Sequence, residues 1–230
     1  METGPSSFSL SRVMSGWWWL LNRDGLRLIQ FAMFWVLVKF GLYALDHMLG
    51  LNQGLGLLST TLLLDPFFFG VFYLVALGDE GWGPMQVQGE ASRRYLALLG
   101  VSVLSNAGIA LGFVLLIVPG LALTVLWSVA IPALLAENKG PIDALKSSYN
   151  LVRRNFWSVV GAFFVYVVGV SAVTVLLLFT GLSSDDGAPG PLLALAAVIE
   201  VISSIIGIYL ATAIYRELAF RDRLDVGVFD

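Results

Sequence analysis

The sequence predicts an all-α membrane protein with six transmembrane helices and with interfacial amphipathic helices before spans one, three and five. Apolar residues make up 58% of the 230 positions and charged residues only 13%. A soluble domain has ~45–50% apolar and ~25% charged residues, so this composition excludes an ordinary soluble fold. The apolar residues gather in runs of about twenty, the length that crosses a bilayer core of ~30 Å. Little chain is left for a separate catalytic domain.

Residues 1–25 are predicted to form an N-terminal interfacial amphipathic helix, because apolar residues recur there at helical spacing. Trp17, Trp18 and Trp19 have an apolar body and a polar N–H, which suits the membrane surface. No small-residue cleavage site follows a short apolar core, so the segment is not a cleavable signal peptide. Residues 26–220 are predicted to form the six-span domain and residues 221–230 a cytoplasmic tail.

The six predicted spans cover residues 26–49, 55–78, 95–118, 121–135, 156–180 and 192–215. The fourth is short, so it either continues into Ala136 and Glu137 or lies between the others without fully crossing. Pro132 is expected to kink it, because proline has no backbone N–H to donate.

Spans three and four are predicted to form an antiparallel hairpin, because Pro119 and Gly120 leave room only for a tight turn between them. Gly108 and Gly112 in span three are spaced as in a GxxxG motif, which lets two helices approach closely.

Basic residues predict the orientation. Every Lys and Arg except Lys39 lies before or at the start of span one, between spans two and three, between spans four and five, or after span six. Cytoplasmic segments have an excess of Lys and Arg, so both termini are predicted to be cytoplasmic. The titratable residues of the opposite loops are Asp46, His47, Asp185 and Asp186.

The interfacial helix before span five is the clearest of the three and is expected over residues 141–155. Its apolar face, directed toward the bilayer or the bundle, is formed by Ile142, Leu145, Tyr149 and Val152, and its basic residues are Lys146, Arg153 and Arg154. Residues 85–94 form a weaker helix of the same kind.

The dipeptides Gly4-Pro5, Gly83-Pro84 and Gly140-Pro141 each precede one interfacial helix and a pair of spans. This arrangement is compatible with a threefold internal repeat. Unequal unit lengths, and a further Gly190-Pro191 in an outer loop, leave the alternative of chance similarity open.

Lys39, Asp65 and Glu200 are the ionisable residues in the middle of predicted spans. A charge at that depth costs ~2.5–3.5 kcal/mol, so each should find a partner inside the bundle. Lys39 is expected to contact Asp65 or Glu200, with Asp65 preferred because spans one and two are sequential. Either one Lys–carboxylate pair is structural, or the residues form a proton or ion relay or a polar site for a lipid headgroup. Asn106 is a possible further member.

No catalytic, cofactor-binding or metal site is predicted. The chain has no cysteine and a single histidine, and it contains no GxSxG or HExxH motif. The Gly-rich residues 50–56 lack the basic residue and the flanking strand of a phosphate loop. A net charge of −3 argues against nucleic-acid binding.

Residues 115–159 combine several elements: a Val-Pro-Gly turn, Pro132, an acidic residue and a glycine before a short helix, the run Ala144-Leu145-Lys146-Ser147-Ser148, Leu151, and Asn155-Phe156. This combination, with a terminal Tyr215-Arg216, resembles the YciC-like bacterial inner-membrane proteins and the membrane domain of some bacterial glycerophosphodiester phosphodiesterases. The resemblance implies a six-span bundle in a bacterial inner membrane. It implies no catalysis, because the phosphodiesterase site lies in a separate soluble domain.

The sequence thus predicts a non-enzymatic polytopic inner-membrane protein that interacts with membrane lipids, with a membrane-protein partner or with a second copy of itself. The alternative is a small secondary transporter or proton-coupled permease that uses Lys39, Asp65 and Glu200. A water-accessible cavity that reaches all three residues would favour transport, whereas a closed pair would favour the structural role.

Overall fold

The computed structural model describes residues 8–49, 60–78, 82–182 and 189–227, and within these ranges every regular element is helical. The predicted all-α class is therefore confirmed. The elements are α1 (Leu10–Met48), the π-helix η1 (Thr60–Leu64), α3 (Asp65–Leu77), α4 (Pro84–Arg93), α5 (Tyr95–Leu115), α6 (Ile117–Leu126), α7 (Ala130–Glu137), α8 (Pro141–Arg153), α9 (Phe156–Leu182) and α10 (Pro189–Gly227).

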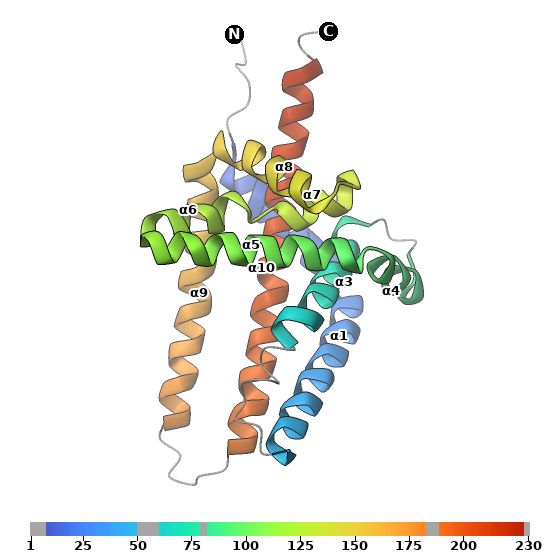
Figure 1. Ribbon diagram of the computed structural model, residues 1–230, viewed down its shortest axis with the longest axis vertical. Coiled ribbons are helices and arrows are strands. Elements are labelled where there is room, and N and C mark those ends of the chain that lie inside the picture. Colours follow the sequence, from blue (N-terminus) through green and yellow to red (C-terminus); the bar gives the residue numbers. More distant parts are fainter. Residues whose placement is uncertain (1–7, 50–59, 79–81, 183–188, 228–230) are drawn as a thin grey trace.

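The long helices α1, α9 and α10 run along the long axis of the molecule (Figure 1). Helix α10 packs along α1, and the first turns of α1 lie at the same end as the last turns of α10. Near that end α5, α6, α7 and α8 lie across the long helices (Figure 1). The six predicted spans therefore do not all run side by side.

Five stretches are long and apolar enough to cross a membrane, as expected of a membrane protein. They are Leu10–Leu42, Tyr95–Leu115, Ile117–Glu137, Phe156–Val173 and Val198–Asp222. A shorter apolar helix, Leu62–Leu77, lies where the second span is predicted. Residues 50–59, 79–81 and 183–188 lie outside the described residues, as does Gly4-Pro5.

Helix α1 joins the predicted interfacial helix and the first predicted span in one uninterrupted helix. No proline occurs between residues 10 and 48, and α-helical hydrogen bonding can therefore continue through both segments. Helix α10 likewise continues to Gly227 through part of the predicted tail, and it begins before Gly190-Pro191, which was expected in a loop.

Helices α4 and α8, which occupy two of the segments predicted to be interfacial, begin in the same way. Gly83 (φ −74°, ψ 161°) and Gly140 (φ −71°, ψ 166°) are both extended N-caps, and each is followed by proline as the first helical residue. Proline suits that position because its missing N–H would have had no partner within the helix.

Helices α5 and α6 form the predicted antiparallel hairpin, but its turn is not at Pro119-Gly120. Leu116 is extended (φ −162°, ψ 148°) and reverses the chain, and α6 begins at Ile117. Pro119 and Gly120 therefore lie in the first turn of α6, where a proline is tolerated. Gly112 packs directly against Gly120, because a Cβ added to Gly112 would lie 2.9 Å from the Gly120 Cα.

The predicted fourth span is interrupted at residues 127–129, which separate α6 from α7. Pro132 explains the break, since it cannot donate to the carbonyl of Ser128 and its ring collides with that carbonyl. Instead of the predicted kink, the helix is interrupted just before Pro132. The Ser148 hydroxyl donates to the freed Leu126 carbonyl at 2.7 Å and holds α6 against α8.

We expect a cysteine introduced at Leu116 to be unreactive toward a membrane-impermeant maleimide added from the outer side. The hairpin lies across α9 and α10, so its turn does not extend to the opposite end of those helices (Figure 1). The natural chain has no cysteine, so single substitutions report accessibility directly. Gly89→Cys on α4, where a Cβ meets nothing within 4 Å, serves as the inner-side control and Gln53→Cys as the outer-side control. Outer labelling of Leu116→Cys would support six crossing spans instead.

Candidate functional site

The three predicted intramembrane charges meet in one cluster. The Lys39 Nζ atom lies 2.6 Å from Glu200 Oε1 and 3.4 Å from Asp65 Oδ1. The predicted contact of Lys39 is therefore present, but with both acids, and Glu200 rather than Asp65 is the closer partner. Asn106 does not join them; it lies exposed on α5.

The cluster lies where three elements converge: α1 contributes Lys39, the first residue of α3 contributes Asp65, and α10 contributes Glu200. The π-helix η1 precedes Asp65, and single π-turns of this kind are frequent at functional sites. Pro66 follows Asp65 in the first turn of α3 and begins a new α-helix there.

Aromatic rings close the inner side of the cluster. The Lys39 ammonium lies 4.9 Å from the centre of the Trp35 ring, a cation–π distance. Trp35 in turn stacks on Phe68 with ring centres 5.4 Å apart. Lys39 and Asp65 side chains are only 2% and 8% exposed, whereas that of Glu200 is 48% exposed. The cluster is therefore sealed on the α1 and α3 side and open only at Glu200.

A second buried charge was not predicted from the sequence. Asp24 forms two hydrogen bonds with Arg23, at 2.9 and 2.7 Å, and accepts a third from the Tyr209 hydroxyl at 3.1 Å. Arg23 and Asp24 both lie within the segment that was predicted to be an interfacial helix, and the sequence signal that was missed is the pair of adjacent opposite charges next to a predicted span. The contacts tie α1 to α10.

Two arginines cap the end of α3. Arg23 donates to the Val75 carbonyl at 3.0 Å, and Arg216 donates to the Ala76 carbonyl at 2.8 Å. The last carbonyls of a helix have no partner within it and carry partial negative charge, so guanidinium groups stabilise them. Helix α3 is thus fixed at its C-terminal end by α1 and α10.

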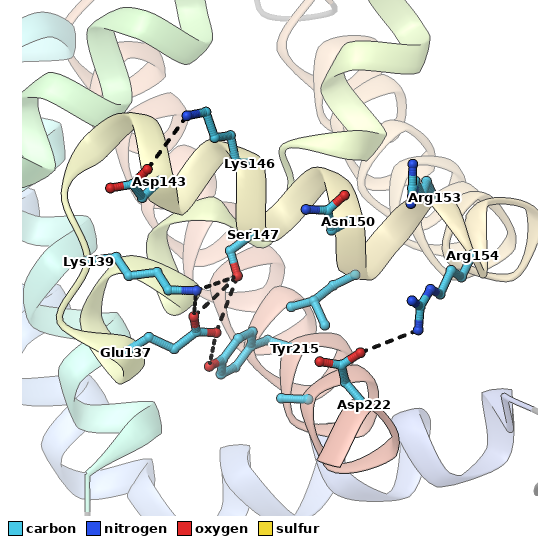
Figure 2. A pocket seen from close by; sticks show the side chains of 12 residues that line it. Glu137, Lys139, Asp143, Lys146, Ser147, Asn150, Arg153, Arg154, Tyr215 and Asp222 are labelled. Atoms are coloured by element: carbon cyan, nitrogen blue, oxygen red, sulfur yellow. Dashed lines mark hydrogen bonds and ion pairs between the residues drawn. The ribbon is translucent and has the colours of Figure 1, made fainter. Parts of the chain in front are cut away.

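A polar cavity of about 930 Å³ lies between the end of α7, helix α8 and the last turns of α10 (Figure 2). The Glu137 carboxylate accepts hydrogen bonds from Tyr215 at 2.9 Å and from Ser147 at 3.2 Å, and it pairs with Lys139. On the other side of the cavity Arg154 pairs with Asp222 at 3.4 Å. Charges of both signs line the cavity, and most of them form ion pairs with one another (Figure 2): Glu137 with Lys139, Asp143 with Lys146, and Arg154 with Asp222.

Residues on which the family resemblance rests meet at this cavity although they are far apart in the sequence. Glu137, Ser147 and Tyr215 share the network described above, and Asn155 accepts a hydrogen bond from Arg221 at 2.9 Å nearby. The motif residues thus connect α7, α8 and α10. No cavity was predicted here from the sequence.

The predicted basic side of α8 lines the cavity with Lys146, Arg153 and Arg154. Of its predicted apolar face, Val152 is buried and Leu145 half-buried within the bundle, whereas Ile142 and Tyr149 are 60% and 43% exposed. The buried side consists instead of Ala144, Ser148 and Val152. Small residues are buried because α8 approaches its neighbours closely, as at Ser148, which bonds to the backbone of α6.

An apolar groove of about 370 Å³ runs between α1, α9 and α10, and it too was not predicted. Its lining includes Met14 and Trp17 from α1, Tyr166 and Gly169 from α9, and Ile202 and Ile206 from α10. The polar atoms of the two aromatic residues point into helix backbone: Trp17 donates to the Ile206 carbonyl at 3.2 Å and Tyr166 to the Ser203 carbonyl at 2.9 Å. The open part of the groove is therefore lined almost entirely by carbon atoms.

A sequence model of the family described as a domain of unknown function (DUF7847) matches residues 55–218. This match includes Asp65, Glu200 and the Glu137–Tyr215 network but not Lys39. No curated protein and no solved structure matches the chain. Because the matched region is well over half of the sequence, the chain belongs to this family.

Proposed function

We propose that this member of the DUF7847 family is a non-enzymatic protein of a bacterial inner membrane that binds a phospholipid, with one acyl chain in the groove between α1, α9 and α10. The bacterial inner membrane follows from the resemblance of residues 115–159, and the cytoplasmic location of both termini follows from the distribution of basic residues.

The apolar groove is the observation that supports this proposal. Two of its three walls belong to Phe156–Val173 and Val198–Asp222, stretches apolar enough to cross a membrane, which supports a position at bilayer depth. Its volume of about 370 Å³ is many times the ~30 Å³ of one water molecule. Apolar cavities stay dry, and the apolar molecules available at this depth are acyl chains. The groove therefore suits a chain in extended form better than it suits water or a polar solute.

We expect the Gly169→Leu variant to bind phospholipid about tenfold more weakly than the natural protein does, and therefore to retain less of it. A Cβ at Gly169 meets nothing within 4 Å, so leucine fills the groove without disturbing the helices. Each methylene group of the acyl chain that the leucine displaces from the groove costs ~0.8 kcal/mol of binding free energy. The loss of two such groups corresponds to about a tenfold change in affinity. The measurement is native mass spectrometry of the protein released from mild detergent, with the bound lipid identified by fragmentation.

Gly161→Leu is the matched control, because Gly161 also lies on α9 with open space around its Cβ but does not line the groove. It should retain lipid as the natural protein does. Equal lipid retention by Gly169→Leu and Gly161→Leu would exclude the groove as the binding site.

The second candidate function is the proton-coupled permease, which is favoured by the half-exposed carboxylate of Glu200. Against it, Lys39 and Asp65 are sealed, and neither the polar cavity nor the apolar groove is lined by any residue of the cluster. Proton flux into proteoliposomes that is abolished by Asp65→Asn would establish transport.

A further inference from the structure

The Lys39–Asp65–Glu200 cluster contains more acidic groups than basic groups. It contains one ammonium and two carboxyl groups, with Lys39 within 4 Å of both acids. In the described part of the chain, the charged side chains that act on Asp65 are Lys39 and Glu200, and the other polar neighbour is the Trp35 indole. If both acids were ionised, the cluster would have a net charge of −1 at bilayer depth.

That net charge is unfavourable for two reasons. An uncompensated charge is strongly destabilised in the membrane interior. Two carboxylates that share a single cation also repel each other, and one of them then tends to keep its proton. One further positive charge is needed, and a proton supplies it without any additional ligand.

We propose that the cluster binds one exchangeable proton, shared between Asp65 and Glu200. The neutral cluster then consists of one ammonium, one carboxylate and one carboxylic acid. This site is separate from the lipid groove, and the inference does not depend on the proposed function.

The geometry favours Asp65 as the acid that holds the proton. Glu200 accepts the short 2.6 Å hydrogen bond from Lys39, which stabilises its ionised form. Asp65 lies farther away, at 3.4 Å, and its Oδ1 atom is buried with no hydrogen-bond partner among the described residues. The proton nevertheless belongs to the pair, because the two acids are coupled through Lys39.

Exchange with the surroundings takes place at Glu200. Its side chain is 48% exposed, whereas that of Asp65 is 8% exposed. Lys39 is already within ion-pair distance of both acids, so it can pair with Asp65 when the proton moves to Glu200. Such a transfer leaves the net charge of the cluster unchanged.

The test is infrared spectroscopy of the purified protein in lipid nanodiscs, which separates the carbonyl stretch of a protonated carboxyl group from that of a carboxylate. At neutral pH we expect one protonated carboxyl group in the natural protein. We expect none in Asp65→Asn or in Glu200→Gln, because each leaves one ammonium with one carboxylate. Lys39→Met should contain two, twice the intensity of the natural protein. The control is Glu217→Gln on the same helix, which removes an acid paired with Arg12 and should leave the intensity unchanged.

Three outcomes would overturn the proposal. Absence of the band in the natural protein would show that both acids are ionised, and a band that persists in both amide variants would place the proton elsewhere. A band that disappears on addition of sodium chloride at constant pH would show that a metal cation is the natural occupant. If Lys39→Met does not fold, the two amide variants still decide the question.

Discussion

Replacement of Lys39 by methionine is expected to lower the free energy of unfolding by about 3–5 kcal/mol, as found when one partner of a buried ion pair is removed. Lys39 is the only cation that faces Asp65 and Glu200 in the described part of the chain, at 3.4 and 2.6 Å. Its loss leaves two acids without a counter-charge, and both must then be protonated. The measurement is denaturant-induced unfolding in mixed micelles, followed by tryptophan fluorescence.

The acidic partners provide the controls for this prediction. Asp65→Asn and Glu200→Gln each leave a balanced pair with Lys39, so each should lower the free energy of unfolding by no more than about 1 kcal/mol. The double variant Lys39→Met/Glu200→Gln should be less destabilised than the sum of its two single variants. Equal destabilisation by Lys39→Met and Glu200→Gln would contradict a role for Lys39 as the shared cation.

Replacement of Gly112 by leucine is expected to lower the free energy of unfolding by about 1–3 kcal/mol or more by forcing α5 and α6 apart. A Cβ at Gly112 would lie 2.9 Å from the Cα and 3.0 Å from the backbone nitrogen of Gly120. These are backbone atoms, which cannot rotate away as the end of a side chain can. The expected result is a lower midpoint of thermal unfolding in detergent.

Gly161→Leu serves as the control here as well, because it adds the same side chain to a helix where the Cβ has open space. It should unfold at the temperature of the natural protein. If Gly112→Leu did the same, the close contact of the two hairpin helices would be disproved.

The hydropathy pattern predicted where helices occur along the chain, but it did not predict the angles at which the helices pack against one another. The predicted fifth span, 156–180, agrees closely with α9, and the predicted helix 141–155 with α8, because proline, glycine and apolar runs mark their ends locally. The direction of α5 relative to α9 depends on contacts between distant segments, which no local pattern encodes. The turn at Leu116 was missed because Pro119 is equally compatible with a turn and with the first turn of a helix.

The charge cluster was predictable because a charge in the membrane interior needs a partner, which limits the choices to Lys39, Asp65 and Glu200. Which acid lies closer was not predictable, since the packing of α10 along α1 decides it. Asp24 and Glu137 were missed because acids near the ends of spans usually face water. The groove was missed because its walls have the same apolar composition as any surface that faces lipid.

The crossed orientation of the α5–α6 hairpin is expected to affect the shape of the surrounding bilayer. With α9 and α10 along the membrane normal, the hairpin lies parallel to the membrane surface, near the end where α1 begins (Figure 1). Leu96, Leu111, Val114 and Val118 are 79%, 63%, 82% and 75% exposed, so we expect the hairpin to lie among acyl chains rather than in water. Two helices, each about 10 Å wide, then occupy area in one leaflet and none in the other. The added area in one leaflet favours curvature of the membrane. We therefore expect the protein to concentrate in regions where the leaflet that contains the hairpin is on the convex side.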